Sequence, residues 1–508
     1  PFNSITNAVT MAPQVELFTT LACRGKISVM EETVFASVEP GNSNSCASDP
    51  AVQASVASLI TVTSTLLGIL TFITCGWWGS FSDRRGRKRM IGISAISQLI
   101  SAVNVLLVAK YVEQIPGGYY WVLVVDSITL GALGGKQLRV FEPGKIKCST
   151  SLLPRSRVFS LLAGFLLVGV GIGPLLGSLI VRVTHNILSV FYLAAGFRII
   201  QAAFVWFLLP ESLSTAQMHR ALIKYQAISL PTDDPTPFYL HRVFFFLKPL
   251  SVLMPDKPAY PKSLAGRERN WDLPILVLAY GLIILASSSL INQLLYAIFI
   301  FGWGSEYLGY CMSGMGITRA IYLTLILPVV IKFMKSRQSA PSVRSAESEA
   351  LLSNEDPTPR AASATHNSAV DLGLARFSIV VEIATFAALP FAPTGFVFIL
   401  FFIFGSLSAA LSPAIHSLAL DIYSRKFGKN EPMESGKLFG ALSVVQCLFG
   451  QILGPPMYGL IYAATVATFP RTIFFVALGS AVVSFALLNC VRLRPAARDS
   501  EGPEDIDG

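Results

Sequence analysis

The chain has 508 residues, of which 53% are hydrophobic and only 14% are charged, and its formal net charge is +9. A soluble protein carries about 25% charged residues, so this composition excludes an ordinary soluble domain and favours a multi-pass membrane protein. The excess of Lys and Arg does not indicate nucleic-acid binding, because these residues gather in loops on one expected side of the membrane.

Apolar runs of about 20 residues recur along the chain, and each is long enough for a helix to cross ~30 Å of hydrocarbon. In the first half they cover residues 4–23, 56–79, 91–109, a run that begins near Tyr119, 158–181 and 187–209. In the second half they cover residues 274–300, 307–333, 377–391, 396–420, 437–464 and 471–491. We therefore predict an all-α membrane protein with about twelve transmembrane helices in two six-helix bundles.

Polar segments divide the chain into four parts. We expect an N-terminal bundle, a cytoplasmic linker, a C-terminal bundle and a cytoplasmic tail over residues 1–210, 211–273, 274–492 and 493–508. Within the second bundle, residues 334–376 are rich in Ser, Ala and charge and poor in aromatic residues, which favours a disordered cytoplasmic loop.

Two stretches depart from a regular pattern. The chain begins at Pro1 rather than Met, so we expect a fragment or a processed form whose first helix is truncated at its start. Residues 136–147 are basic and contain Pro143 and Gly144 where the fourth helix should still be apolar, which predicts an irregular end to that helix. A gene-model error and a real cytoplasmic insertion both explain this segment.

A basic turn over residues 79–89 joins the second and third apolar runs and holds five cations and one anion. The positive-inside rule places this turn in the cytoplasm. Its spacing resembles the signature between helices 2 and 3 of the major facilitator superfamily, on the residues Gly79, Asp83, Gly86, Arg87 and Lys88. The resemblance implies a gate in which Asp83 and Arg87 close the cytoplasmic side against the start of helix 11 near Ser435.

A short repeat supports two related halves. The fifth and eleventh runs both contain Gly-x-x-x-Gly-Pro, on the residues Gly169, Gly173, Pro174 and Gly177, and Gly450, Gly454 and Pro455. Small residues allow close helix packing and Pro allows a kink, so helix packing alone would explain the pattern. The first copy also resembles the motif of proton-coupled antiporters in the same superfamily.

Shorter patches carry a closer resemblance. Residues 301–310, followed by Gly316, Arg319 and residues 327–328, are similar to fungal facilitators related to tetracycline-resistance exporters and to the proton-coupled folate transporter group. Residues 246–250 and 412–414 are similar to the same proteins.

Ionisable groups at membrane depth are costly and therefore candidates for transport chemistry. They are Glu16, Asp126, Arg198, Arg319, Glu382 and His416. A polar stripe on the seventh run, which includes Asn292, Gln293 and Tyr296, is broad enough to line a cavity. A fixed ion pair that locks helices together is the alternative role for the charged groups.

Seven cysteines occur singly, without metal-ligand spacing. Cys23, Cys46 and Cys311 fall on or near the expected non-cytoplasmic side, where a Cys23–Cys46 disulfide is one expectation. We see no metal site, no cofactor site, no nucleophile–base pattern and no glycine-rich loop for ATP phosphates, so we do not expect an enzyme.

These features favour a secondary active transporter of a small organic solute by alternating access, coupled to protons. Export by proton antiport is the alternative within transport, and a non-transporting membrane sensor or scaffold is the alternative outside it. We expect the partners to be the solute, the proton and the lipid bilayer, and we expect a monomer. Both termini should be cytoplasmic, in the plasma membrane or, given the acidic dileucine pattern at residues 347–352, in a vacuolar or endosomal membrane.

Overall fold

The structure is a computed structural model. It describes residues 2–33, 46–115, 118–134, 155–211, parts of 213–223, residue 253, and residues 271–332, 359–424 and 435–491. Several expectations fall outside these ranges and have no structural description here: the irregular segment 136–147, the dileucine pattern, and most of the linker.

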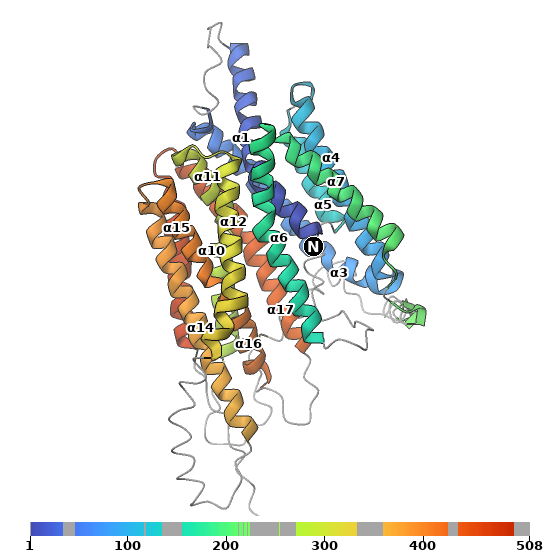
Figure 1. The fold of residues 1–508 in the computed structure, drawn as a ribbon, viewed down its shortest axis with the longest axis vertical. Coiled ribbons are helices and arrows are strands. Elements are labelled where there is room, and N and C mark those ends of the chain that lie inside the picture. Colours follow the sequence, from blue (N-terminus) through green and yellow to red (C-terminus); the bar gives the residue numbers. More distant parts are fainter. Residues whose placement is uncertain are drawn as a thin grey trace, which may run out of the picture.

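Twelve helical segments cross the described part of the molecule (Figure 1). The first six are α1 (Phe2–Thr33), α3 (Pro50–Arg85), α4 (Arg87–Tyr111), α5 (Tyr120–Ala132), α6 (Arg155–Thr184) and α7 (Leu188–Ala203), which continues as a π-helical turn over Phe204–Leu208. The last six are α10 (Asp272–Ser287) with α11 (Leu290–Phe301), α12 (Ser305–Ile321), α14 (Pro359–Ala388), α15 (Gly395–Gly405) with α16 (Leu411–Ser424), α17 (Ser435–Cys447) with α18 (Gly454–Thr465), and α19 (Thr472–Cys490). The predicted twelve-helix architecture is confirmed.

Nine helical stretches among the described residues are long and apolar enough to span a membrane. Two further apolar stretches, Tyr120–Ala132 and Gly169–Thr184, are shorter. Many large hydrophobic side chains on these helices are exposed, as expected for surfaces that face lipid rather than water.

Helix α14 begins earlier than expected. The interval 359–376 was assigned to a disordered loop, but the structure continues the helix back to Pro359. Pro is favoured at the first helical position, and the Ala-rich residues after it have high helix propensity. A composition poor in aromatic residues argues against a packed core, yet it does not prevent a spanning helix from extending beyond the membrane.

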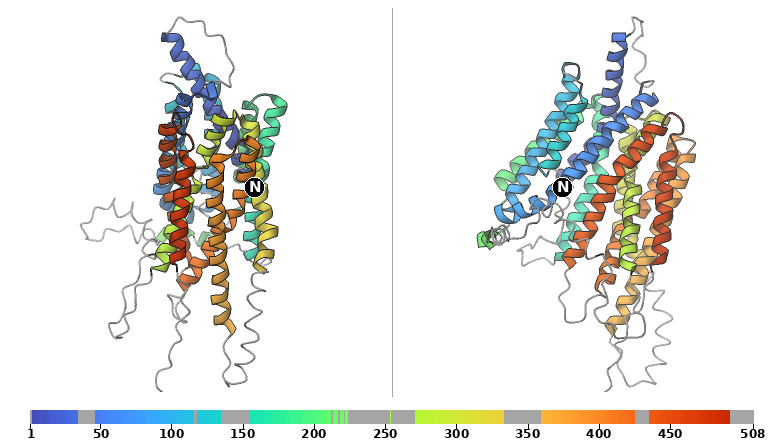
Figure 2. Two further views of the ribbon diagram at one scale, coloured as in Figure 1. Left: turned by 90° about the vertical axis from the view of Figure 1, so that its left-hand side faces the viewer. Right: turned by 180° about the vertical axis from the view of Figure 1, so that it is seen from behind.

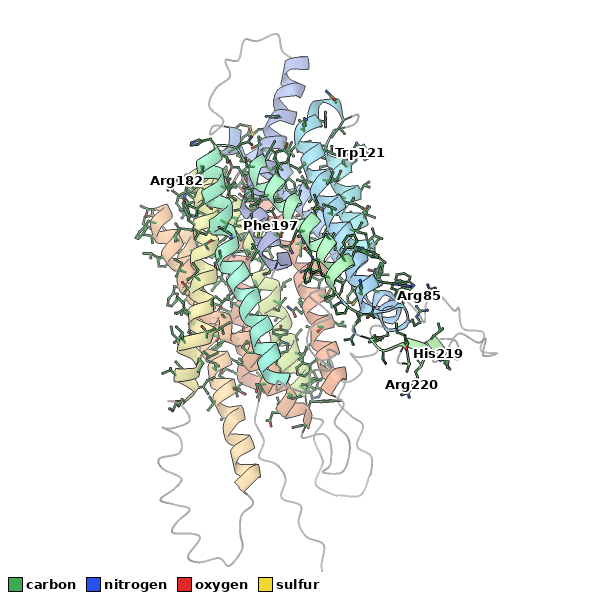
Figure 3. All side chains as sticks on the ribbon, turned by 45° about the vertical axis from the view of Figure 1, so that its right-hand side comes forward. Arg85, Trp121, Arg182, Phe197, His219 and Arg220 are labelled. Carbon is green, nitrogen blue, oxygen red and sulfur yellow. A yellow bond between two sulfur atoms is a disulfide. The ribbon has the colours of Figure 1, made fainter. Side chains whose placement is uncertain are left out.

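Capping residues fix the ends of α3. Asp49 accepts a hydrogen bond from the backbone N–H of Ala51 at 2.8 Å, and Pro50 occupies the first helical position. At the other end Gly86 has φ +98°, a conformation that suits glycine and reverses the chain into α4. We call the end of the molecule that carries this turn the basic end. Figure 3 shows Arg85 at this end and Arg182, in the last turn of α6, at the opposite end.

The largest contacts between the halves are α6 against α12 and α3 against α18, and α1 also packs on α12. The helices α4, α5 and α7 lie side by side and incline away from the second half toward the basic end (Figure 2).

Glycines allow the closest of the helix contacts. Gly173 and Gly177 of α6 pack on Ala8 and the Val9 carbonyl of α1. In the second half, Gly450 and Gly454 lie against Ile284 and Ser288. The fifth helix thus contacts the first as the eleventh contacts the seventh, which is the pattern of a two-half repeat.

Candidate solute and proton site

Four polar side chains meet near the middle of four spans in the second half. They are Glu382 of α14, Arg319 of α12, Ser287 of α10 and Ser408 of the 3-10 turn Ser406–Ala410. Ser287 Oγ lies within hydrogen-bond distance of Glu382 Oε1, at 3.3 Å, Ser408 lies beside the same carboxylate, and Arg319 interacts with it electrostatically. Tyr458 of α18, which is buried, also interacts electrostatically with Glu382.

The helices around Glu382 are interrupted at this level. Between α10 and α11, the hydroxyls of Ser287, Ser288 and Ser289 bond to carbonyls three or four residues back, at 2.9, 2.6 and 2.7 Å. Such bonds compete with the backbone ladder and bend helices. A 3-10 turn separates α15 from α16, and a π-helical segment, Leu448–Leu453, separates α17 from α18. Interruptions of this kind are frequent at functional sites and leave irregular backbone facing the interior.

Arg319 stands apart from the hydrogen-bond network. Its side chain is half-buried, and its Nε is buried without a hydrogen-bond partner. Within the part of the chain that the structure describes, Arg319 forms no ion pair closer than 4.0 Å, although Glu382 is near enough to interact with it. The predicted pair of candidates therefore lies together in space, but the two side chains are not locked in a direct salt bridge.

Arg198 lies in a separate polar cluster of the first half. Its guanidinium donates to Gln98 of α4, to Asn7 of α1 and, at 3.0 Å, to Gln201. Gln98 in turn donates to Ser94 Oγ at 3.2 Å. The arginine thus ties three helices together near the middle of its span, and amide oxygens solvate its charge.

Asp126 bridges two helices of the same half. Ser101 Oγ of α4 donates to Asp126 Oδ2 of α5 at 2.8 Å, and Asn104 lies beside the carboxylate. The side chain is half-buried, so this contact holds α4 and α5 together.

The polar stripe on α11 lies inside the packed core. Asn292, Gln293 and Tyr296 are each at most 4% exposed. Gln293 Nε2 donates to Ser289 Oγ at 2.6 Å, while the ring of Tyr296 packs among Phe301, Phe398 and Phe474. This environment is that of core packing, whereas the stripe was expected to line a cavity.

His416 lies nearer the basic end, in α16. Its Nδ1 is 2.6 Å from the Ser412 carbonyl oxygen, and the rings of Tyr280 and Phe439 flank it. Hydrogen bonding and aromatic packing account for its position, and it does not contact the Glu382 cluster.

Glu16 lies between the halves rather than in the central cluster. Its carboxylate accepts a hydrogen bond from the backbone N–H of Ser305 at the start of α12. Beside it, Glu306 forms an ion pair with Arg182 at 3.8 Å, and Ser178 Oγ donates to the Glu306 carbonyl at 3.1 Å. These contacts join α1 and α6 to α12 at the end opposite the basic turn.

At the basic end, the partner of the turn is Glu211, directly after α7. The backbone N–H groups of Arg87 and Lys88 donate to its carboxylate at 2.9 and 3.2 Å. This contact joins the start of α4 to the residue that opens the linker, whereas the predicted gate reached across to Ser435. Glu211 and Glu306 were not singled out as site residues from sequence. Each carboxylate lies at a helix N-terminus, Glu306 in the first turn of α12 and Glu211 through its contact with the first turn of α4, where the helix dipole favours a negative charge.

The sequence profile of the Major Facilitator Superfamily matches residues 27–343, which is more than half of the chain. The chain is 23% identical over 468 residues to an uncharacterized membrane protein of Saccharomyces cerevisiae, a match that covers 87% of this chain and 77% of that protein. It is 22% identical over 438 residues to an MFS-type transporter, avaJ, of Aspergillus versicolor, with 84% and 76% covered.

Among solved structures, a mutant of the nucleoside transporter NupG has the same fold, with a TM-score of 0.53 at 13% identity over 95% of this chain and 99% of that one. Together with the twelve helical segments and the profile match, this shows that the chain belongs to the major facilitator superfamily.

Proposed function

We propose that this chain is a secondary active transporter that moves a small organic solute by alternating access and couples that movement to a proton carried by Glu382. Membership of the superfamily supports a transporter rather than an enzyme. The proton coupling is inferred from the surroundings of Glu382. Its carboxylate is half-buried at the middle of its span, lies within hydrogen-bond distance of the Ser287 hydroxyl, and is not locked in a salt bridge with Arg319. A carboxyl group in such surroundings can exchange a proton at moderate cost when a solute-filled cavity opens to one side.

The proposed orientation places the basic end in the cytoplasm. Five cations in the turn at 79–89 support it through the positive-inside rule. The Cys23–Cys46 disulfide lies toward the opposite end, and disulfides persist in oxidising compartments outside the cytoplasm. Both termini would then be cytoplasmic, and the two bundles would cover residues 1–210 and 274–492. The chain would act as a monomer, in the plasma membrane or in a vacuolar or endosomal membrane.

The test is solute flux in proteoliposomes with an imposed pH gradient. The panel contains anionic, neutral and cationic organic solutes, and Glu382→Gln is compared with Asp371→Asn. Asp371 is on the same helix but nearer the basic end, where it accepts a hydrogen bond from Ser417 at 2.6 Å.

We expect the gradient to drive accumulation in the wild type and in Asp371→Asn, and not in Glu382→Gln. Accumulation of the solute on the alkaline side of the membrane indicates symport with protons, and accumulation on the acidic side indicates antiport. Flux of no solute at all would favour the sensor or scaffold alternative.

A further inference from the structure

The charge of Arg319 lacks a bonded partner within the described residues. An arginine remains protonated at any physiological pH, so this guanidinium is a permanent positive charge near the middle of the apolar span Ser305–Lys332. Its Nε is buried without an acceptor, and it makes no hydrogen bond or close ion pair with the described residues. A charge held at membrane depth without compensation is costly, so a ligand that supplies the missing negative charge would be strongly favoured there.

Two buried serine hydroxyls, one on α12 and one on the 3-10 turn Ser406–Ala410, can also donate hydrogen bonds. Ser313 Oγ on α12 and Ser406 Oγ on the neighbouring 3-10 turn are both buried, and neither has a hydrogen-bond partner among the residues that the structure describes. That turn packs on α12. Hydroxyls can donate to an anionic oxygen while the guanidinium forms charge-assisted bonds to it. Because the guanidinium of Arg319 is positively charged and only donates, this part of α12 suits a carboxylate or phosphate oxygen better than an ammonium group.

Glu382 is the nearby charge that can compete for the same guanidinium. Within the described residues, the titratable groups that interact with Glu382 are Arg319 from α12 and Tyr458 from α18. When Glu382 is ionised, it and Arg319 together carry no net charge, and an anion gains little. When Glu382 is protonated, the pair carries a net charge of +1, and a monovalent anion neutralises it.

We propose that Arg319 binds the anionic group of the solute, so that the carrier moves a monovalent organic anion together with the proton on Glu382. This inference rests on the proposed transport function and adds the substrate class and the direction of coupling. Proton and anion bind in the same conformational cycle and leave together, which makes the process electroneutral symport. By linkage, a bound proton raises anion affinity and a bound anion raises proton affinity by the same factor.

The experiment uses the full chain in proteoliposomes. The probes are labelled aromatic and aliphatic monocarboxylates, each paired with its neutral amide or ester, together with primary amines of similar size. We expect the acid-outside gradient to drive uptake of at least one anion and not of its neutral analogue. Clamping the membrane potential should leave that uptake unchanged.

Variants distinguish the role of Arg319 from that of Glu382. Arg319→Gln should lower anion uptake at least tenfold. Arg376→Gln is the matched control, because Arg376 is a second span arginine that reaches the Leu488 carbonyl at 3.5 Å instead of the cluster. Glu382→Gln should abolish accumulation driven by the gradient yet retain anion exchange at zero gradient. Anion binding to the wild type should weaken by up to tenfold per pH unit in the alkaline range, and Glu382→Gln should remove that dependence.

Three outcomes would overturn the inference. The first is gradient-driven transport of a neutral or cationic solute that depends on Glu382, which would leave the proposed function standing. The second is anion uptake that is unchanged in Arg319→Gln. The third is a wild type that moves no anion of the panel, and in that case flux of the other solutes decides whether transport itself fails. If Arg319→Gln does not fold, loss of the pH dependence of anion binding in Glu382→Gln still tests the coupling.

Discussion

The carboxylate of Glu16 accepts a hydrogen bond from the backbone N–H of Ser305, and this contact links the first helix of one half to the start of a helix in the other. Ser305 is the first residue of α12, where unpaired N–H groups and the helix dipole favour a negative charge. The ion pair of Arg182 with Glu306 lies next to it. A cluster at one end of the molecule therefore bridges the two halves.

At the basic end, the backbone N–H groups of Arg87 and Lys88 are instead bonded to Glu211, which follows α7. The helices α4, α5 and α7 incline away from the second half on that side (Figure 1). This asymmetry corresponds to a carrier that is closed at the Glu16 end. Opening that end would require the contact between Glu16 and α12 to break.

Weakening the Glu16 contact should therefore favour the conformation that is open at that end. Glu16→Ala removes a charged cap that contributes on the order of 1 kcal/mol, which corresponds to about a fivefold change in the conformational equilibrium. Distances between spin labels at the ends of α1 and α12 would measure the shift. Gln14→Ala is the control, since Gln14 is exposed on the same helix. An unchanged distance distribution in Glu16→Ala would contradict a gating role.

Close packing of α6 on α12 predicts a stability difference between two glycines. A Cβ atom on Gly316 would lie 2.8 Å from Gly171 Cα, so Gly316→Ala should force the helices apart and cost about 1–3 kcal/mol. At Gly479 of α19, a Cβ atom would meet nothing within 4 Å, so Gly479→Ala should be neutral or stabilising by up to about 1 kcal/mol. Thermal unfolding in detergent compares the two variants. Equal melting temperatures would show that the α6–α12 contact is looser than described.

The Glu211 contact predicts a local effect at the basic turn. Glu211→Ala removes the acceptor for the N–H groups of Arg87 and Lys88 and should destabilise the first turn of α4 by about 1 kcal/mol. Hydrogen exchange of the amides at residues 87–90 should rise in Glu211→Ala, whereas Asp83→Asn should leave it unchanged.

Both variants should fold, and Asp83→Asn should reduce transport although the amount of protein in the membrane is normal. Normal solute flux in Asp83→Asn would show that Asp83 has no role in the gate.

The spacing and hydropathy of the apolar runs were sufficient to predict the fold from the sequence. Runs of about 20 apolar residues mark the spans because a helix must satisfy its own backbone groups in lipid. The repeated Gly-x-x-x-Gly-Pro pointed to close packing at the fifth and eleventh helices, and Gly173 and Gly454 do lie against neighbouring helices. Local signals of this kind do not depend on how distant segments meet.

The partners of the polar residues could not be predicted, because they come from distant parts of the chain. Glu16 was a candidate for the central site, yet its partner is Ser305 in the other half. Tyr296 was expected at a cavity, but it packs against Phe301 of its own helix and against Phe398 and Phe474 of two distant helices. Hydropathy alone does not distinguish a polar residue that faces a cavity from one that is bonded inside the core.

The disulfide between Cys23 and Cys46, which the structure confirms, offers a direct test of orientation. If the basic end is cytoplasmic, this bond faces the outside of the cell or the lumen of an organelle. In sealed right-side-out vesicles or intact cells, a membrane-impermeant phosphine should then reduce it, and a charged maleimide should label the new thiols. Arg85→Cys, an exposed position at the basic end, should label only after permeabilisation. If the reverse pattern is observed, the basic end faces outward and the proposed orientation is wrong.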